Sequence, residues 1–167
     1  MKSTLVGLGY DVHRLKKGRP LILGGVCIAS PVGLDGHSDA DVLVHALADA
    51  LLGAAGQPDI GCFFPNTDES IRGVCSLEIL QKVHSLLQSE GLTISNADCT
   101  VIAEFPTVAP YLHAIKGKLA EVLDIKPLRI GVKATTNEGM GFLGRREGIA
   151  VLAIASLASS NTLSVSR

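Results

Sequence analysis

Apolar residues recur with two different periods along the chain, and the two periods predict both strands and helices. Residues 4–15 and 20–29 are rich in Val, Ile and Leu and are separated by the polar sequence KKGR, which predicts an early β-hairpin. Helical spacing of apolar residues predicts helices over 39–53, 76–91 and 110–123. Further apolar runs predict strands at 97–105, 128–136 and 148–158.

The segments between these runs have the composition of loops. Residues 59–73 are crowded with Gly, Pro, Asn and Asp, residues 137–148 are rich in glycine, and the polar residues 159–167 are expected to form a flexible tail. The order β-β-α-α-β-α-β-β predicts an α+β fold of the α/β-sandwich type, with helices on one face of a mixed or antiparallel β-sheet. We expect a single domain, 1–167. The uncovered sheet face of so apolar a chain favours a homo-oligomer.

Charge and composition exclude several classes of partner. The net charge is −1 and the basic residues form no long run, so neither a nucleic-acid partner nor an anionic membrane surface is expected. The apolar run 148–158 is shorter than the ~20 residues needed to span a bilayer. Without a signal or transit pattern, a cytoplasmic localisation is expected. The 4 scattered cysteines include no CxxC pair and predict free, mostly buried thiols.

Asp11 and His13 are two residues apart in a predicted strand, so their side chains should lie on the same face. The pair could bind a metal ion or simply form a polar strand edge. His45 lies in an apolar helix and is either a third ligand or a hydrogen-bonded core histidine. An Asp/His/His set suits Zn²⁺ with an open fourth position. Asp41 and Asp49, one turn either side of His45, are candidates to support its other ring nitrogen.

The turn before the first predicted helix is a candidate anion site. His37 and Ser38 lie where free backbone N–H groups and the helix dipole favour a phosphate. The alternative is helix capping by Ser38 or Asp39.

The segment after the strand 128–136 is a second candidate phosphate site. It contains the hydroxyls of Thr135 and Thr136, the carboxylate of Glu138 and several glycines. Such groups suit phosphate oxygens and Mg²⁺, although an ordinary charged loop has the same composition. No nucleophilic Ser or Cys lies beside a base in the sequence, so electrostatic phosphoryl chemistry fits better than covalent catalysis.

The motifs YDVHRL, GHSDADVLVHALADALLGA, DIG, FFPNTD, VKATTNEGMGF and GRREGI occur in order over residues 6–157. Together they resemble the 2-C-methyl-D-erythritol 2,4-cyclodiphosphate synthase family of the non-mevalonate isoprenoid pathway. The resemblance implies a lyase that converts 4-diphosphocytidyl-2-C-methyl-D-erythritol 2-phosphate to 2-C-methyl-D-erythritol 2,4-cyclodiphosphate and CMP. In this reaction the substrate's own 2-phosphate attacks the β-phosphorus, so no protein nucleophile is required.

The resemblance also assigns metal ions and catalytic groups. It implies one zinc ion per subunit, bound by Asp11, His13 and His45. It implies that a magnesium or manganese ion arrives with the substrate and takes Glu138 as its protein ligand. His37 and Thr136 are the implied catalytic residues, which stabilise the transition state.

Further residues are implied to bind substrate, partly across a subunit interface. The implied substrate-binding set is Asp11, Val12, His13, His37, Ser38, Asp59, Ile60, Gly61, Phe64, Pro65, Asn66, Thr67, Asp68, Ala103, Glu104, Phe105, Pro106, Thr107, Val108, Ala109, Thr135, Thr136, Asn137, Glu138, Phe142 and Arg145. Residues 103–109 and 135–138 are implied to serve the nucleotide pocket of a neighbouring subunit in a homotrimer. A central cavity that can hold an isoprenoid diphosphate is implied to be lined by Tyr10, Phe142, Arg145 and Glu147.

Three positions depart from the common family pattern. Asn66 replaces a frequent Asp, Thr107 a frequent Lys and Tyr10 a common Phe. Two other functions are compatible with the motifs. A metal-dependent phosphohydrolase would release a linear product. A non-catalytic trimer would bind isoprenoid diphosphates, but it would have no use for the candidate metal ligands.

Overall fold

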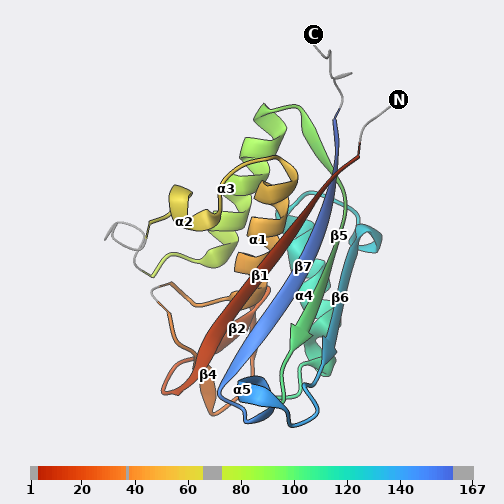
Figure 1. Ribbon diagram of the computed structural model, residues 1–167. Helices are drawn as coiled ribbons and strands as arrows, with labels where there is room; N and C mark the ends of the chain where they lie inside the picture. The colour runs from red at the N-terminus through yellow and green to blue at the C-terminus, as the bar shows by residue number, and fades with distance from the viewer. Residues whose placement is uncertain (1–3, 37, 66–72, 160–167) are drawn as a thin grey trace.

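The computed structural model describes residues 4–36, 38–65 and 73–159 (Figure 1). Its main sheet has five strands in the order β4-β1-β7-β5-β6, and a separate two-stranded sheet pairs β2 with β3. The strands are β1 (Thr4–Lys17), β2 (Leu21–Leu23), β3 (Val26–Ile28), β4 (Val32–Leu34), β5 (Leu92–Ile102), β6 (Ile130–Thr135) and β7 (Gly148–Ser159).

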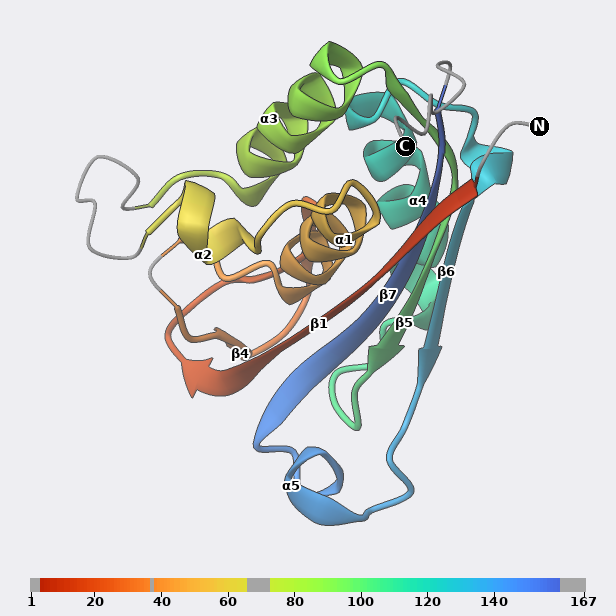
Figure 2. The same cartoon turned by 45° about the horizontal axis from the view of Figure 1, so that its top comes forward.

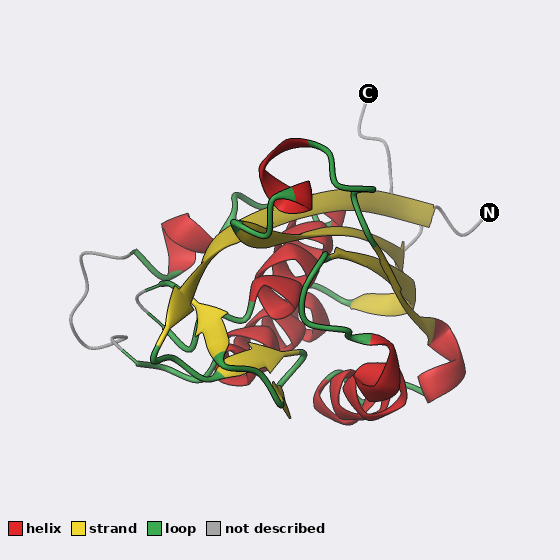
Figure 3. Ribbon diagram, turned by 90° about the horizontal axis from the view of Figure 1, so that it is seen from below, coloured by secondary structure: helices red, strands yellow, loops and turns green. Residues whose placement is uncertain are grey.

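The helices form a layer against the main sheet. The helical elements are α1 (Val42–Ala54), α2 (Ile60–Phe63), α3 (Ser76–Ser89), η2 (Ala109–Tyr111), α4 (Leu112–Val122), η3 (Pro127–Arg129) and α5 (Gly141–Gly144). Helix α1 packs on β1 and β7, α3 on α1, and α4 on β6, as Figure 2 shows. Viewed from below, the long helices lie on one side of the sheet (Figure 3). The α+β fold with helices on one face is confirmed.

Pairing within the main sheet is mixed, as predicted. β1 is antiparallel to β7 and to β4, and β7 is antiparallel to β5. β5 and β6 are parallel, so their carboxyl ends lie at the same edge of the sheet. This arrangement brings the segments that follow β5 and β6 side by side.

The predicted pairing of residues 4–15 with residues 20–29 is wrong. Residues 20–29 instead fold on themselves as β2 and β3. Gly24 and Gly25 both have positive φ, 58° and 73°, which is the backbone of a two-residue hairpin turn. β1 takes β4 and β7 as its neighbours.

Several element boundaries and burial expectations also differ. The predicted loops contain the short helices α2 and α5, β5 begins at Leu92 rather than Ala97, and α1 begins at Val42 rather than Asp39. The thiols are free as predicted, but Cys99 is buried whereas Cys27, Cys62 and Cys75 are exposed. Ser159 belongs to β7, and the rest of the expected tail, 160–167, lies outside the described residues.

Glycines in β1 let α1 lie directly on the strand backbone. A Cβ atom at Gly7 would be 2.1 Å from the carbonyl oxygen of Ala50, and one at Gly9 would be 1.9 Å from that of Ala46. Because side chains two apart on a strand share a face, Asp11 points to the same side as these glycines. The close approach therefore brings the beginning of α1, with His45, against Asp11.

The opposite face of the sheet is apolar and uncovered in the single chain. Its exposed large apolar side chains include Val6, Leu8, Tyr10, Leu152 and Ile154, and Leu8 is 65% exposed. In the part of the chain that the structure describes, no helix has the length and apolar character needed to cross a membrane.

Candidate metal centre and active site

Asp11, His13 and His45 converge at the contact between β1 and α1. Asp11 Oδ2 lies 3.0 Å from His13 Nε2 and 3.1 Å from His45 Nδ1. The two ring nitrogens are 3.4 Å apart. The three residues form a group able to hold a metal ion, as the Asp-x-His pattern and His45 predicted.

The spacing of these three atoms fits a small tetrahedral cation. Ligand atoms about 2.0–2.1 Å from a tetrahedral zinc ion lie roughly 3.3 Å from one another. One carboxylate oxygen and two imidazole nitrogens are also a ligand set that zinc takes in proteins. Three protein ligands leave a fourth position for a substrate oxygen, so the arrangement suits catalysis better than a purely structural site.

Backbone contacts hold His13 in the orientation that a metal ligand needs. Its Nδ1 lies 2.6 Å from the carbonyl oxygen of Asp35. A carbonyl only accepts, so Nδ1 carries the hydrogen and Nε2 presents its lone pair to the site. Gly36 packs against the ring, since a Cβ there would be 3.1 Å from Cε1 of His13.

The charges within the group stabilise one another. Burial alone would raise the pKa of Asp11, but hydrogen bonds from His13 and His45 outweigh it and hold that pKa well below its usual range. Burial would lower the pKa of His13, but the hydrogen bond to Asp11 outweighs it and raises that pKa above 6.5. A proton on His13 thus competes with any cation for this site.

The other ring nitrogen of His45 faces residues that the sequence did not link to it. Its Nε2 lies 3.0 Å from Ser76 Oγ and 3.5 Å from Ser38 Oγ. Ser76 Oγ in turn hydrogen-bonds to Asp39 Oδ1.

Asp41 and Asp49, expected to support His45, have other partners in the structure. Asp41 is the N-cap of α1, accepts hydrogen bonds from the N–H groups of Leu43 and Val44, and also accepts from two glycine N–H groups of the β2–β3 turn. Its complete burial raises its pKa to about 6. Asp41 occupies these N–H groups, so the helix end is capped. Capping was the alternative to an anion site, but the capping residue is Asp41 rather than Ser38 or Asp39.

The turn that precedes α1 is clamped by Arg19, a residue that no motif singled out. Its Nη1 donates to the carbonyl of Gly36 and its Nη2 to that of Ser38, each at 2.8 Å. His37 lies outside the described residues. Lys16 adds a hydrogen bond to Asp35 that lowers the pKa of that carboxyl. An Arg in a strand-to-strand turn has no sequence signal that distinguishes it from a solvated one.

The residues expected around the erythritol moiety are anchored to α1. Asp49 Oδ1 accepts from the N–H of Ile60 at 2.8 Å, and Asp59 accepts from that of Cys62 as the N-cap of α2. Asp49 lies one helical turn after His45, so it ties this segment to the metal group. Beyond Pro65, the expected residues Asn66, Thr67 and Asp68 lie outside the described residues.

The segments that follow β5 and β6 meet at one edge of the sheet. Glu104 Oε1 accepts from the N–H groups of Asn137 and Gly139, at 2.8 and 3.0 Å. These bonds flank Glu138, which is exposed and has a φ of 51°. Thr136 Oγ1 donates to Glu138 Oε1 at 3.1 Å. The structure thus groups the expected nucleotide and diphosphate residues, with Glu104 holding the turn.

Two strands separate this turn from the metal group within one chain. In the strand order, β7 and β5 lie between β1, which carries Asp11, and β6, which leads to Glu138. Three inter-strand spacings of about 4.8 Å amount to roughly 14 Å. Glu138 is not part of the group that Asp11, His13 and His45 form.

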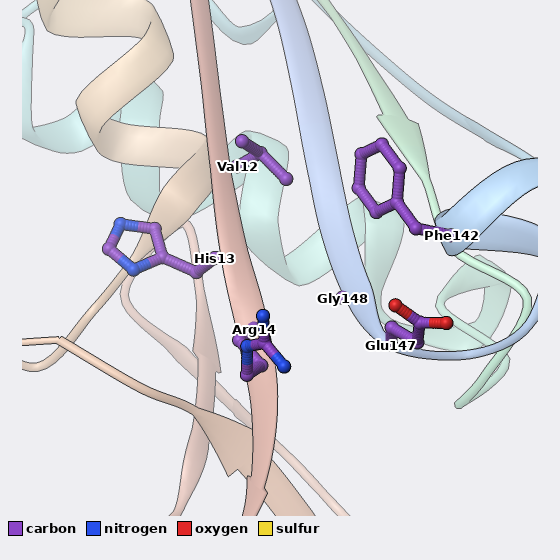
Figure 4. Close-up of a pocket in the computed structure, with 6 residues that line it drawn as sticks. All are labelled: Val12, His13, Arg14, Phe142, Glu147 and Gly148. Atoms are coloured by element: carbon purple, nitrogen blue, oxygen red, sulfur yellow. The ribbon is translucent and has the colours of Figure 1, made fainter.

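A pocket of about 380 Å³ lies across β1 from the metal group. Its lining residues are Val12, His13, Arg14, Phe142, Glu147 and Gly148. Figure 4 shows the ring of His13 on the side of β1 away from Phe142 and Glu147. Arg145 Nε donates to Glu147 Oε1 at 2.7 Å. The pocket contains two of the four residues expected around a central cavity.

The fold and the site define an α+β protein with a centre suited to a divalent metal ion. The YgbB family model matches residues 4–158. A 2-C-methyl-D-erythritol 2,4-cyclodiphosphate synthase of Akkermansia muciniphila is 57% identical over 155 residues, which cover 92% of each chain. One of Symbiobacterium thermophilum is 56% identical over 92% of this chain and 98% of its own. The chain belongs to this synthase family, which confirms the family and lyase class that the motifs predicted.

Solved structures of the family have the same fold. An IspF of Plasmodium falciparum in complex with CDP is 32% identical, with a TM-score of 0.84 over 96% of this chain and 99% of that chain. The bifunctional IspDF of Campylobacter jejuni is 41% identical, with a TM-score of 0.93 over 96% of this chain. This chain covers 44% of that bifunctional protein.

Proposed function

We propose that the chain closes the eight-membered ring of 2-C-methyl-D-erythritol 2,4-cyclodiphosphate from its cytidyl-linked 2-phosphate precursor and releases CMP. The observation that carries the proposal is the convergence of Asp11, His13 and His45 at zinc-like spacing in a member of this family. Attacking and leaving groups belong to one substrate molecule, so the protein has mainly to fold the substrate and offset its charge.

Each group of residues that the resemblance assigns has a role in this reaction. Asp11, His13 and His45 hold zinc, and Glu138 holds magnesium or manganese. A bound divalent ion supplies Lewis-acid polarisation of phosphate oxygens. Ser38, positioned by Arg19, binds the attacking phosphate together with His37, and Thr136 donates to the diphosphate. The segment from Asp59 to Gly61 orients the erythritol.

The active site is completed by a second copy of the chain in a homotrimer. Two observations support this assembly. The turn of Glu138 is separated from the metal group by two strands of the same sheet, and the sheet face with Val6, Leu8 and Ile154 is apolar and exposed. In the trimer, residues 103–109 and 135–138 of one copy bind nucleotide and diphosphate beside the metal group of the next.

The central cavity is proposed where copies of the pocket meet. Phe142 and Glu147 line that pocket in each chain. Tyr10, in β1, and Arg145, next to α5, are close to these residues in sequence and are exposed.

The activity is tested by ³¹P NMR of the purified protein with the cytidyl-methylerythritol phosphate substrate and Mg²⁺, with and without a chelator. CMP together with a cyclic diphosphate, both abolished by the chelator, is the expected result. A linear phosphate product would identify a phosphohydrolase instead. No turnover by a metal-loaded trimer would leave a binding function for the cavity.

Sharing of the site between copies is tested by mixing two inactive variants, His45→Ala and Glu138→Gln. In randomly mixed trimers, about a quarter of the sites combine an intact metal group with an intact Glu138 from its neighbour. We expect roughly that fraction of wild-type turnover after the variants are unfolded and refolded together. If the mixture stays as inactive as its components, both groups serve the same chain.

A further inference from the structure

The second ring nitrogen of His45 belongs to a chain of three side chains that ends at a carboxylate. His45 Nε2 lies 3.0 Å from Ser76 Oγ, and Ser76 Oγ hydrogen-bonds to Asp39 Oδ1. Asp39 Oδ2 also accepts from the backbone N–H of Ser76 at 2.9 Å. Ser76 is fully buried, at 0% exposure, so water does not compete for these bonds.

The hydrogens along this chain can be assigned by counting donors. A serine hydroxyl has one hydrogen, and a carboxylate can only accept, so the Ser76 hydrogen goes to Asp39. Ser76 Oγ is then an acceptor toward His45, and Nε2 must carry the imidazole hydrogen. A neutral imidazole has one N–H, so Nδ1 keeps a lone pair. That lone pair lies 3.1 Å from Asp11 Oδ2 and 3.4 Å from His13 Nε2, inside the metal group.

The opposite tautomer would close the site. With the hydrogen on Nδ1, His45 would donate to Asp11 Oδ2 at 3.1 Å. Two of the three ligand atoms would then be hydrogen-bonded to each other and unavailable to the ion. Ser38 Oγ is a weaker partner for Nε2, because it lies 3.5 Å away and already accepts from the N–H of Ala40. The choice between tautomers therefore depends on Ser76 and Asp39.

We propose that Asp39 and Ser76 are positioning residues that fix His45 as the Nε2–H tautomer and so keep its Nδ1 free for the metal ion. Among the described residues, neither belongs to the group that could hold the ion. Helix α3 contributes no ligand, yet through its first residue it sets the orientation of one. The inference rests on the proposed metal-binding role of Asp11, His13 and His45.

The first test is zinc affinity, measured by competition with a chromophoric chelator. Ser76→Ala removes the hydroxyl but keeps the backbone N–H at this position, so the start of α3 retains its hydrogen bond to Asp39. We expect zinc affinity to fall about 10- to 100-fold, the usual effect of removing a partner of a ligating histidine. Ser85→Ala, on the exposed side of the same helix, is the matched control and should leave the affinity unchanged.

A double-mutant cycle tests whether Asp39 and Ser76 act on His45 through one hydrogen-bonded series or independently. Asp39→Asn replaces one acceptor oxygen by a donor, so it should also weaken zinc binding, and the double variant should be no weaker than Ser76→Ala alone. Additive losses of zinc affinity would show that the two residues act independently and would contradict the proposal. Unchanged affinity in Ser76→Ala, including a fall in Tm without loss of affinity, would overturn the proposal.

The tautomer is read directly from the imidazole ¹⁵N shifts of His45 in the metal-free protein, at a pH where the ring is neutral. We expect Nε2–H in the wild type and a shift toward Nδ1–H in Ser76→Ala. A wild-type protein with the hydrogen on Nδ1 would contradict the assignment. Failure of the proposed metal-binding role is distinguishable, because the wild type itself would then bind no zinc, and failure of the cyclising activity is read separately from the ³¹P NMR products.

Discussion

The two candidate metal-binding regions differ in how much of their geometry is already present in one chain. Asp11, His13 and His45 lie on a long strand and a helix, with ligand atoms 3.0–3.4 Å apart and ring nitrogens fixed from behind. Glu138 stands exposed in a turn, held by Glu104 and Thr136. In the proposed function, this difference separates an ion that is resident in the subunit from one that binds only with substrate and a neighbouring copy.

The largest effect is expected from removing a ligand of the resident ion. His45→Ala should lose zinc and, because a bound metal supplies several kcal/mol of transition-state stabilisation, lower turnover roughly a thousandfold or more. Light scattering should show an unchanged oligomer, since the apolar sheet face is untouched. Full turnover of this variant in metal-stripped buffer would remove the distinction between the two regions.

Gly9→Ala tests whether backbone packing builds the resident site. The added Cβ would lie 1.9 Å from the carbonyl oxygen of Ala46 and force α1 away from β1. We expect a loss of at least about 3 kcal/mol in stability, the upper end of overpacking effects, together with weakened zinc binding. Gly53→Ala in α1 is the control, because its nearest atom is 3.9 Å away and its Tm should not fall. Equal Tm values for both variants would refute the packing argument.

The pH dependence of zinc binding distinguishes the regions further. The folded chain holds the proton on His13 with a pKa above 6.5, so the stability this proton contributes is complete below pH 6.5 and is lost as pH rises through the raised pKa. Zinc must displace that proton. Below the raised pKa, affinity should therefore fall by up to about tenfold per pH unit. Calorimetry should give the same slope for Glu138→Gln, and a different slope would couple the two regions.

The smallest effect is expected at the turn. Glu104→Ala leaves the N–H groups of Asn137 and Gly139 to water, which should weaken the magnesium dependence of turnover by about fivefold, equivalent to about 1 kcal/mol. Glu104→Gln keeps an acceptor oxygen and should retain most of the wild-type magnesium dependence. Zinc affinity should not change in either variant. A loss as large in the Gln variant as in the Ala variant would show that the charge of Glu104, rather than its hydrogen bonds, matters.

Periodic and local features of this protein could be predicted from sequence. The helices α3 and α4 follow their apolar spacing, and Asp11 with His13 follows from strand alternation. The position of Gly24 and Gly25 in a hairpin turn could have been noticed, because paired glycines favour such a turn. The bonds of His45 to Ser76 and of Glu104 to the Glu138 turn could not, since they join segments whose approach is set by tertiary packing.

The bare backbone of β1 at Gly7 and Gly9 also bears on which ion the protein selects. Helix α1 rests on the strand without intervening side chains, so neither the gap nor the ligand spacing can widen without lifting the helix from the core. Calcium, with bonds of about 2.3–2.6 Å and a demand for six or more oxygens, would require such widening. The absence of side chains at Gly7 and Gly9 thus limits the size of the ion that the site can accept.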